Sequence, residues 1–348
     1  MRVWWIVAGI AVVAGLSGLS PGARGTDRAT TFDEEAAARI TPGQPSVRGD
    51  DPAWFFLNSE LRQRALGAFW MRPWEEVAKN GGDPTVAIGA FRDALAERGV
   101  SLLAVPVPLK STVYPEKLAE SFGPGDPRST APFVTRLRME GLPVTDAGTW
   151  MREWRAENPA SKWFCAQDSH FSPDACVALA GRIVDEMGDL SVDLATIPAE
   201  RRVSAEATSR GILSIEGDQV RGSKWEGSVE REALDVRFVS RGDPVEPWPD
   251  SPVLLLGDSH TLVFQEGEKA GMHARAAGLF DHLSLRFGFA LDRVGVRGSG
   301  LVEARKQLFY HAAENPGYWD SKRLVIWVFS IREFTQSQDR FIPIPLAP

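Results

Sequence analysis

Blocks of apolar and polar residues alternate along the chain and predict helices and strands in turn. Apolar residues recur at helical spacing from Ile88 to Leu95, and Gly99 ends this predicted helix. The run 101–108 that follows is short and almost wholly apolar, which is typical of a strand buried on both faces of a sheet. Together the two elements form one αβ unit.

Two further helices follow. One covers Phe133–Leu137 and precedes a shorter strand over 143–146. The other begins at Ser172, an N-cap residue, has Pro173 in its first position, and carries an apolar stripe as far as Met187. Each helix continues the alternation.

The same alternation resumes near the C-terminus. Strands are predicted over 253–256, 293–296 and 324–329, with a helical stretch over 274–287 between the first two. Residues 190–250 are polar and weakly patterned, so they are expected to form an insertion with a few short strands. Alternating helices and buried strands indicate an α/β fold, a doubly wound parallel sheet flanked by helices.

Residues 1–25 are of another kind. An uncharged apolar run extends from Val3 to Leu19, and Pro21 then breaks any helix, a pattern that predicts an export signal. The run would span about 25 Å, short for a membrane-spanning helix and long for a signal-peptide core, so a cleaved signal and a retained anchor both stay open. Residues 26–52 are expected to be a linker, and 53–348 the folded domain.

Composition narrows the classes of function. With 39 Lys+Arg against 46 Asp+Glu the formal charge is −7, which argues against a nucleic-acid partner. Two cysteines and five histidines leave little material for a metal centre, and we expect neither a metal nor a cofactor.

A predicted strand that ends in Gly257-Asp258-Ser259 gives the first chemical indication. In a doubly wound sheet the chemistry lies at the carboxyl ends of the strands. Gly257 permits a tight turn that would project Ser259 as a nucleophile, with its own backbone N–H directed at the group it attacks. Taken alone, the Asp-Ser pair is equally consistent with a helix N-cap.

A serine nucleophile needs a base, and His170 is the histidine best placed to be one. It precedes the helix that begins at Ser172, and Asp168 can bond one imidazole nitrogen while the other faces Ser259. His260 is expected to diverge from the adjacent Ser259 at the turn. The remaining histidines lie in or beside helical stretches and lack an Asp-x-His pattern: His273, His282 and His311.

The order of these motifs resembles the alginate O-acetyltransferase family, the SGNH-hydrolase-like acetyltransferases of bacterial exopolysaccharide export. In ordinary SGNH esterases the Gly-Asp-Ser block comes first and an Asp-x-x-His block comes last. This family instead places Asp-x-His upstream, as Asp168 and His170 stand before Ser259 here. Other stretches carry the resemblance over most of the chain: 54–62, 105–118, 293–305 and 325–334.

The resemblance implies a periplasmic O-acetyltransferase with an SGNH-hydrolase-like fold. Ser259 would be the nucleophile that becomes acetyl-serine, His170 the base and Asp168 its orienting partner. A hydroxyl of a polysaccharide would accept the acetyl group. The family also implies a membrane-bound acetyl carrier protein as partner, and the N-terminal segment would allow association with the membrane.

The group that stabilises the oxyanion is less well defined. The candidates are the backbone N–H of Ser259 and the loop Gly298-Ser299-Gly300. None of the asparagines of the chain lies in that loop, so the Asn donor usual in SGNH enzymes has no counterpart.

Two cations and two cysteines complete the set of candidate residues. Lys110 and Arg305 are candidates for holding an anionic sugar or acetyl donor, although long surface cations are more often simply solvated. Cys165 and Cys176 bracket the Asp-x-His loop, and an oxidising compartment would favour a disulfide between them. The alternative is that both cysteines are ordinary core residues.

Two other functions stay open. In an exported SGNH-type esterase or deacetylase, water would replace the sugar hydroxyl and the same three residues would serve. In a non-catalytic polysaccharide-binding assembly protein only the fold would be kept, and the presence of Asp168, His170 and Ser259 argues against this alternative.

Overall fold

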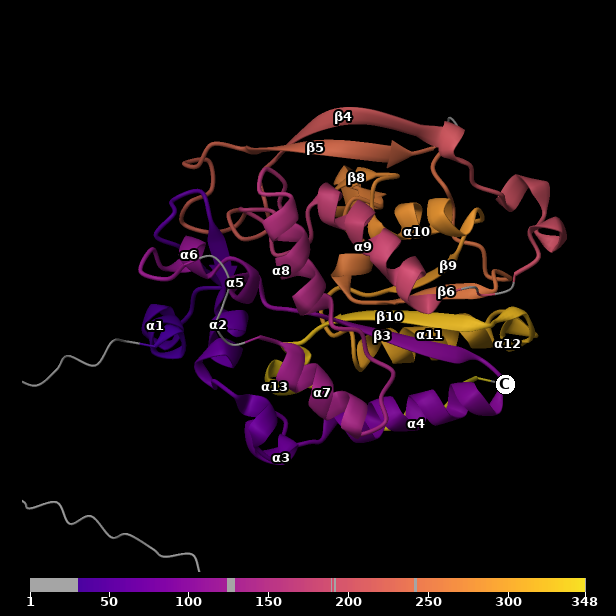
Figure 1. The fold of residues 1–348 in the computed structure, drawn as a ribbon, viewed down its shortest axis with the longest axis horizontal. Helices are drawn as coiled ribbons and strands as arrows, with labels where there is room; N and C mark the ends of the chain where they lie inside the picture. Colours follow the sequence, from indigo (N-terminus) through magenta and orange to yellow (C-terminus); the bar gives the residue numbers. More distant parts are fainter. Residues whose placement is uncertain (1–30, 124–128, 189, 191, 241–242, 348) are drawn as a thin grey trace, which may run out of the picture. The chain divides into compact units, whose positions relative to one another are not determined.

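A four-stranded parallel sheet lies at the centre of the computed structural model (Figure 1). Every neighbouring pair of its strands is parallel, which confirms the predicted α/β class. The strand expected over 143–146 is reduced to a single bridge between Ala104 and Val144. Across the sheet the order is β3 (Ser101–Val107), β10 (Leu324–Ser330), β6 (Val253–Gly257) and β9 (Asp292–Gly295).

Helices cover both faces of this sheet, and each face has its own apolar core (Figure 1). Alternate residues of β6 point to opposite sides, so Leu255 joins one core and Leu254 the other. One core is closed by α8 (Ala147–Glu157), α9 (Pro173–Met187) and α10 (Leu279–Phe287). The other is closed by α3 (Trp74–Val77), α4 (Pro84–Glu97), α7 (Ala131–Met139), α11 (Glu303–Ala313), α12 (Tyr318–Ser321) and α13 (Glu333–Gln336).

The folded domain begins nearer the N-terminus than the sequence suggested. The structure describes residues 31–123, 129–188, 190, 192–240 and 243–347, so the predicted export signal lies outside it. Helix α1 (Phe32–Arg39) packs on α2 (Asn58–Ala65), and β1 (Ser46–Arg48) pairs with β2 (Phe55–Leu57). Residues 32–52 are therefore not a linker, because apolar side chains such as Phe32 are buried against the domain. None of the described helices is long and apolar enough to cross a membrane.

The polar segment 190–250 forms an antiparallel hairpin, β4 (Thr208–Ile215) with β5 (Glu232–Val239), which packs on α9 and α10. The loop between its strands returns to the residues before α9. A Cβ on Gly217 would lie 2.1 Å from the carbonyl oxygen of Gln167, so only glycine allows this approach. The insertion is therefore part of the wall around Asp168.

The helix predicted over 274–287 begins later, at Leu279. A short hairpin of β7 (Glu266–Gly267) and β8 (Met272–Arg275) occupies the preceding residues. His273 and Ala276 have φ values of 64° and 62°, which lie outside the range of a right-handed helix.

Candidate functional site

The turn after β6 presents Ser259 at the carboxyl end of the sheet. Gly257 cannot be replaced there without movement, because a Cβ would lie 2.1 Å from the carbonyl oxygen of Val328 on β10. Asp258 caps a single 3-10 turn, Ser259–Thr261, and its carboxylate accepts the backbone N–H of His260 at 2.9 Å. The Asp258 side chain thus acts as the N-cap of this turn, and Ser259 stays partly exposed.

Ser259, His170 and Asp168 form an unbroken chain of hydrogen bonds. The Nε2 atom of His170 lies 2.7 Å from the Ser259 hydroxyl, and its Nδ1 atom lies 2.5 Å from Oδ1 of Asp168. The backbone N–H of His170 also donates to that oxygen at 3.0 Å. The two imidazole nitrogens therefore have the partners that the sequence predicted.

The second oxygen of Asp168 is held by residues that the sequence did not indicate. Oδ2 accepts the backbone N–H of Asp218 at 2.8 Å and lies 2.9 Å from Nε2 of His273. Asp218 comes from the loop between β4 and β5, and His273 comes from β8. Neither has a local motif that would have identified it, since both are far from Asp168 in the chain.

Charge at the site favours an ionised carboxylate and a basic imidazole. Burial would raise the pKa of Asp168, but the nearby imidazole of His170 and its hydrogen bond outweigh burial and hold that pKa well below the usual value. Burial alone would lower the pKa of His170, whereas the carboxylates of Asp168, Asp218 and Asp258 raise it to about 9.

One set of acidic and histidine side chains in the described part of the chain could hold a metal ion. It consists of Asp168, His170 and Asp218, whose ligand atoms lie within 4.8 Å of one another. These atoms already pair within the site: His170 binds Asp168, and Asp218 accepts the Ser169 hydroxyl at 2.5 Å. The set fits a hydrogen-bonded relay better than a metal centre.

His260 turns away from Ser259 and binds Asp258, its Nδ1 lying 2.8 Å from the carboxylate. Its ring packs on Phe171 and His170, with centroids 4.6 Å and 5.2 Å away. Burial lowers the pKa of His260, so the ring is neutral near pH 7. The His260 ring therefore contributes to the packing around His170.

Lys110 does not face a substrate, which corrects the sequence-based assignment. The side chain is fully buried, and its ammonium donates to the carbonyls of Ala166 and Asp168 at 2.9 and 3.0 Å and to Gln219 Oε1 at 2.9 Å. Burial lowers its pKa to about 8, against the opposing charge of Glu232. Lys110 therefore connects the loop that carries Asp168 to the loop between β4 and β5.

Arg305 is likewise a structural residue. It is 2% exposed, and its guanidinium donates to the carbonyls of Leu301, Ala87 and Ile342 at 2.7, 3.4 and 3.1 Å. Backbone carbonyls of separate segments surround the cation, so no face remains for a ligand.

Lys110→Met is expected to impair both stability and activity. The aliphatic stem keeps its packing, but three buried acceptors lose their donor, each at a cost of about 1–3 kcal/mol. We expect a thermal midpoint lower by several degrees, measured by circular dichroism, and slower turnover of an activated acetyl ester. The partly exposed Lys117, which pairs with Asp51, provides the control: Lys117→Met should change stability by less than about 1 kcal/mol. Equal midpoints for the two variants would contradict the assignment.

The loop Gly298-Ser299-Gly300 lies directly beside the nucleophile turn. A Cβ on Gly300 would lie 3.1 Å from Cβ of Asp258, and Gly298 has a φ of 109°, a value that favours glycine. The Ser299 hydroxyl accepts the backbone N–H of Val302 at 3.4 Å, and burial raises the pKa of the neighbouring Glu333 to about 7. Ser299 therefore anchors the loop, and its side chain is already engaged.

Cys165 and Cys176 are both free thiols, so the expected disulfide is wrong. The Cys165 thiol donates to the carbonyl of Phe171 at 3.4 Å, whereas Cys176 lies in α9 beside the backbone N–H of Leu279. The two sulfur atoms occupy separate environments in the same core. Burial raises the pKa of both thiols.

A thiol titration checks this correction. In the native protein neither cysteine should react with a thiol reagent within minutes, because both are buried and protonated. After denaturation without reductant, two thiols per chain should be titrated. If no thiol were titrated in the denatured protein, the two cysteines would form a disulfide after all.

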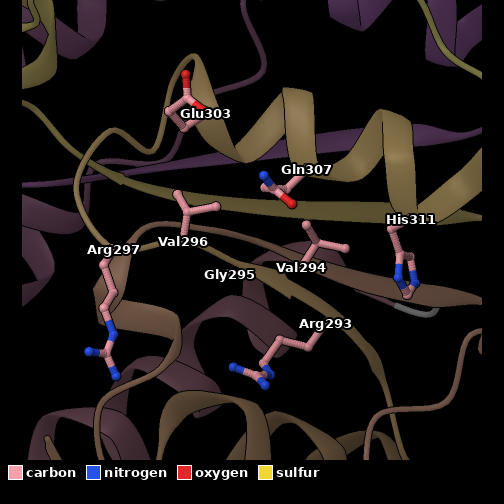
Figure 2. A pocket seen from close by; sticks show the side chains of 8 residues that line it. All are labelled: Arg293, Val294, Gly295, Val296, Arg297, Glu303, Gln307 and His311. Atoms are coloured by element: carbon pink, nitrogen blue, oxygen red, sulfur yellow. The ribbon is translucent and has the colours of Figure 1, made fainter. Parts of the chain in front are cut away.

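A cavity with a volume of about 540 Å³ lies beside β9 (Figure 2). Glu303, Gln307 and His311, spaced four residues apart on α11, line one side. Arg293 and Arg297 line the other side. The floor of the cavity adjoins β6, the strand that precedes the Ser259 turn, because the N–H of Val296 donates to the Gly257 carbonyl at 3.0 Å.

Fold and geometry together define the class of protein. A parallel α/β sheet with a serine after a central strand, hydrogen-bonded to a histidine and an aspartate, is that of an SGNH hydrolase-like domain. The sequence profile described as "SGNH hydrolase-like domain, acetyltransferase AlgX" matches residues 47–266, more than half of the chain. The chain belongs to this acetyltransferase family, as the order of its motifs indicated.

One solved structure shares the fold, and two others align with TM-scores below 0.5. The O-acetyltransferase domain of Pseudomonas putida AlgJ aligns with a TM-score of 0.57 at 18% identity, covering 84% of this chain and 94% of that one. Pseudomonas aeruginosa AlgX aligns with a TM-score of 0.47 at 16% identity, covering 85% and 63%. Bacillus cereus PatB1, solved with a sulfonyl adduct, aligns with a TM-score of 0.46 at 12% identity, covering 84% and 97%. No curated protein sequence matches the chain.

Proposed function

We propose that this chain is a periplasmic enzyme that transfers acetyl groups to hydroxyls of an exopolysaccharide. The observation that carries the proposal is the hydrogen-bonded chain from Ser259 through His170 to the buried carboxylate of Asp168. Membership of the acetyltransferase family supports the choice of acetyl as the transferred group. A membrane-bound acetyl carrier protein is the expected donor.

The geometry suits a two-step reaction through acetyl-serine. His170 Nε2 accepts the proton of the Ser259 hydroxyl while that oxygen attacks the acetyl carbonyl, and the proton then passes to the leaving group. In the second step a sugar hydroxyl gives its proton to His170 and attacks the acetyl carbonyl, the bond from that carbonyl to Ser259 Oγ breaks, and His170 returns the proton to Oγ. Asp168 holds the imidazole and stabilises its charge. The backbone N–H of Ser259 and the Gly298–Gly300 loop are the proposed donors to the oxyanion.

The cavity beside β9 is our candidate for the acceptor sugar. Its arginine, glutamine, histidine and glutamate side chains supply both donors and acceptors, as hydroxyl-rich ligands require. Its floor adjoins the strand that presents Ser259. A sugar held there would compete with water by orientation, since well-placed groups reach effective molarities of about 10⁵ M or more.

An acetyl-transfer assay tests the proposal. Purified protein receives an activated acetyl ester, with and without oligosaccharides from the producing organism, and acetyl groups are followed by mass spectrometry. We expect slow hydrolysis alone and acetylated oligosaccharide when acceptor is present. Rapid acetate release that ignores the acceptor, with removal of acetyl groups from acetylated polymer, would favour the esterase instead.

Two variants of α11 refine this assay. Gln307→Ala removes a side chain from the cavity, so the KM for the oligosaccharide should rise while acetyl-serine forms at the unchanged rate. Tyr310→Ala, an exposed position on the same helix, serves as the control and should leave both quantities unchanged. Equal KM values for the two variants would place the acceptor elsewhere.

A further inference from the structure

His273 lies at the back of the proposed catalytic residues, on the far side of Asp168 from His170. Its Nε2 is 2.9 Å from Oδ2 of Asp168, although the two residues are 105 positions apart in the chain. The imidazole is nearly buried, with 6% of the side chain exposed, and its ring lies against that of Phe264 at a centroid distance of 5.5 Å. The proposed reaction does not use this histidine.

The backbone that delivers His273 is unusual. In the described part of the chain, three non-glycine residues have positive φ values, and all three belong to this segment: Phe264, His273 and Ala276. Such conformations cost free energy and persist where the surrounding structure imposes them. They shape the β7–β8 hairpin so that His273 points back at Asp168.

The same segment begins at the nucleophile turn. The N–H of Val263 donates to the carbonyl of Ser259 at 3.0 Å, and the N–H of Phe264 donates to the carbonyl of Met272 at 2.9 Å. The hairpin therefore links the backbone of the nucleophile to the carboxylate at the other end of the hydrogen-bonded chain.

We propose that His273 is a positioning residue that fixes the carboxylate of Asp168 and, through it, the imidazole of His170. Oδ1 of Asp168 serves His170 alone, with the ring N–H and the backbone N–H as donors. On Oδ2, the only other donor in the described structure is the backbone N–H of Asp218. A carboxylate held by donors on both oxygens cannot rotate away from the imidazole, so removing His273 loosens one side. The inference rests on the proposed roles of Asp168 and His170.

The rate of acetyl-serine formation from an activated acetyl ester, measured in single turnovers, tests this role. His273→Phe keeps a ring but removes the donor, and we expect a rate about 10- to 100-fold lower, as is usual for residues that orient a catalytic group from behind. His273→Gln keeps an N–H donor and should recover to within about threefold of the wild type. A wild-type rate for His273→Phe would overturn the proposal, as would a glutamine variant as slow as the phenylalanine variant.

A double-mutant comparison separates positioning from general packing. In an Asp168→Ala background, His273→Phe should cause no further loss, because the carboxylate through which it acts is gone. An equal loss in both backgrounds would show a merely structural ring. His282→Phe, at a buried histidine of α10, is the matched control and should leave the rate unchanged. Acetyl-serine formation does not depend on the acceptor, so a failure of the transferase proposal would appear in the transfer assay alone.

Discussion

Ser259→Ala is expected to lower acetyl-ester turnover by about 10⁴- to 10⁶-fold while leaving the fold intact. Residues that act as a unit lose nearly the whole effect when one is removed, and only binding and oxyanion stabilisation then remain. His170→Ala should cause a similar loss, and the double variant should be no slower than either single one. The measurement is kcat/KM with an activated acetyl ester, together with circular dichroism to confirm folding.

The control for this series is Ser228→Ala. Ser228 is an exposed serine whose hydroxyl donates to the carbonyl of Trp225 in the loop between β4 and β5. Its removal should change kcat/KM by less than about twofold. If His260→Ala abolished activity while His170→Ala retained it, the base would be His260 and not His170.

Asp168→Asn should have the second largest effect, about a 10⁴-fold loss in kcat. An amide in place of the carboxylate can donate a hydrogen bond to Nδ1 of His170, which favours the tautomer protonated at Nε2 and leaves Nε2 unable to accept from Ser259. The backbone N–H of Asp218 and the His273 ring both need an acceptor at the Oδ2 position, so the amide oxygen takes that place and the NH2 group is directed at Nδ1 of His170.

The pH profile gives a second readout for this variant. A base must be unprotonated to act, so the wild-type kcat/KM should fall as pH drops through the pKa of His170, which the neighbouring carboxylates raise to about 9. Without the negative charge of Asp168 that pKa falls, and the acid limb of the profile moves to lower pH. A limb that stays in place would mean that Asp168 does not set the basicity of His170.

The site draws its residues from several parts of the chain. The turn after β6 supplies Ser259, the loop before α9 supplies His170 and Asp168, and the insertion supplies Asp218. Glu232 of β5 accepts the backbone N–H groups of Ala166 and Gln167 at 2.9 and 3.0 Å. The polar insertion thus holds the loop that carries Asp168 and His170, which explains why its weakly patterned sequence nevertheless folds against the centre of the molecule.

Several features that depend only on neighbouring residues could be predicted from the sequence. The apolar runs of the central strands, the Ser172 cap of α9 and the glycine before Asp258 each require only their own neighbours, so they predicted the sheet and the nucleophile turn. The Asp-x-His spacing also lies within one short loop, where the carboxylate reaches the imidazole two residues later.

The groups that surround Asp168 and His170 come from distant parts of the chain, and only the tertiary structure brings them there. Lys110 and Arg305 are buried because carbonyls from separate segments converge on them, and no local pattern encodes that convergence. Cys165 and Cys176 are close in sequence, but both remain free thiols, the first bonded to the carbonyl of Phe171 and the second in α9. His273 reaches Asp168 through a hairpin whose positive φ values the sequence gives no reason to expect. Contacts across more than 100 residues depend on how the whole chain packs, since spacing along the chain constrains only near neighbours.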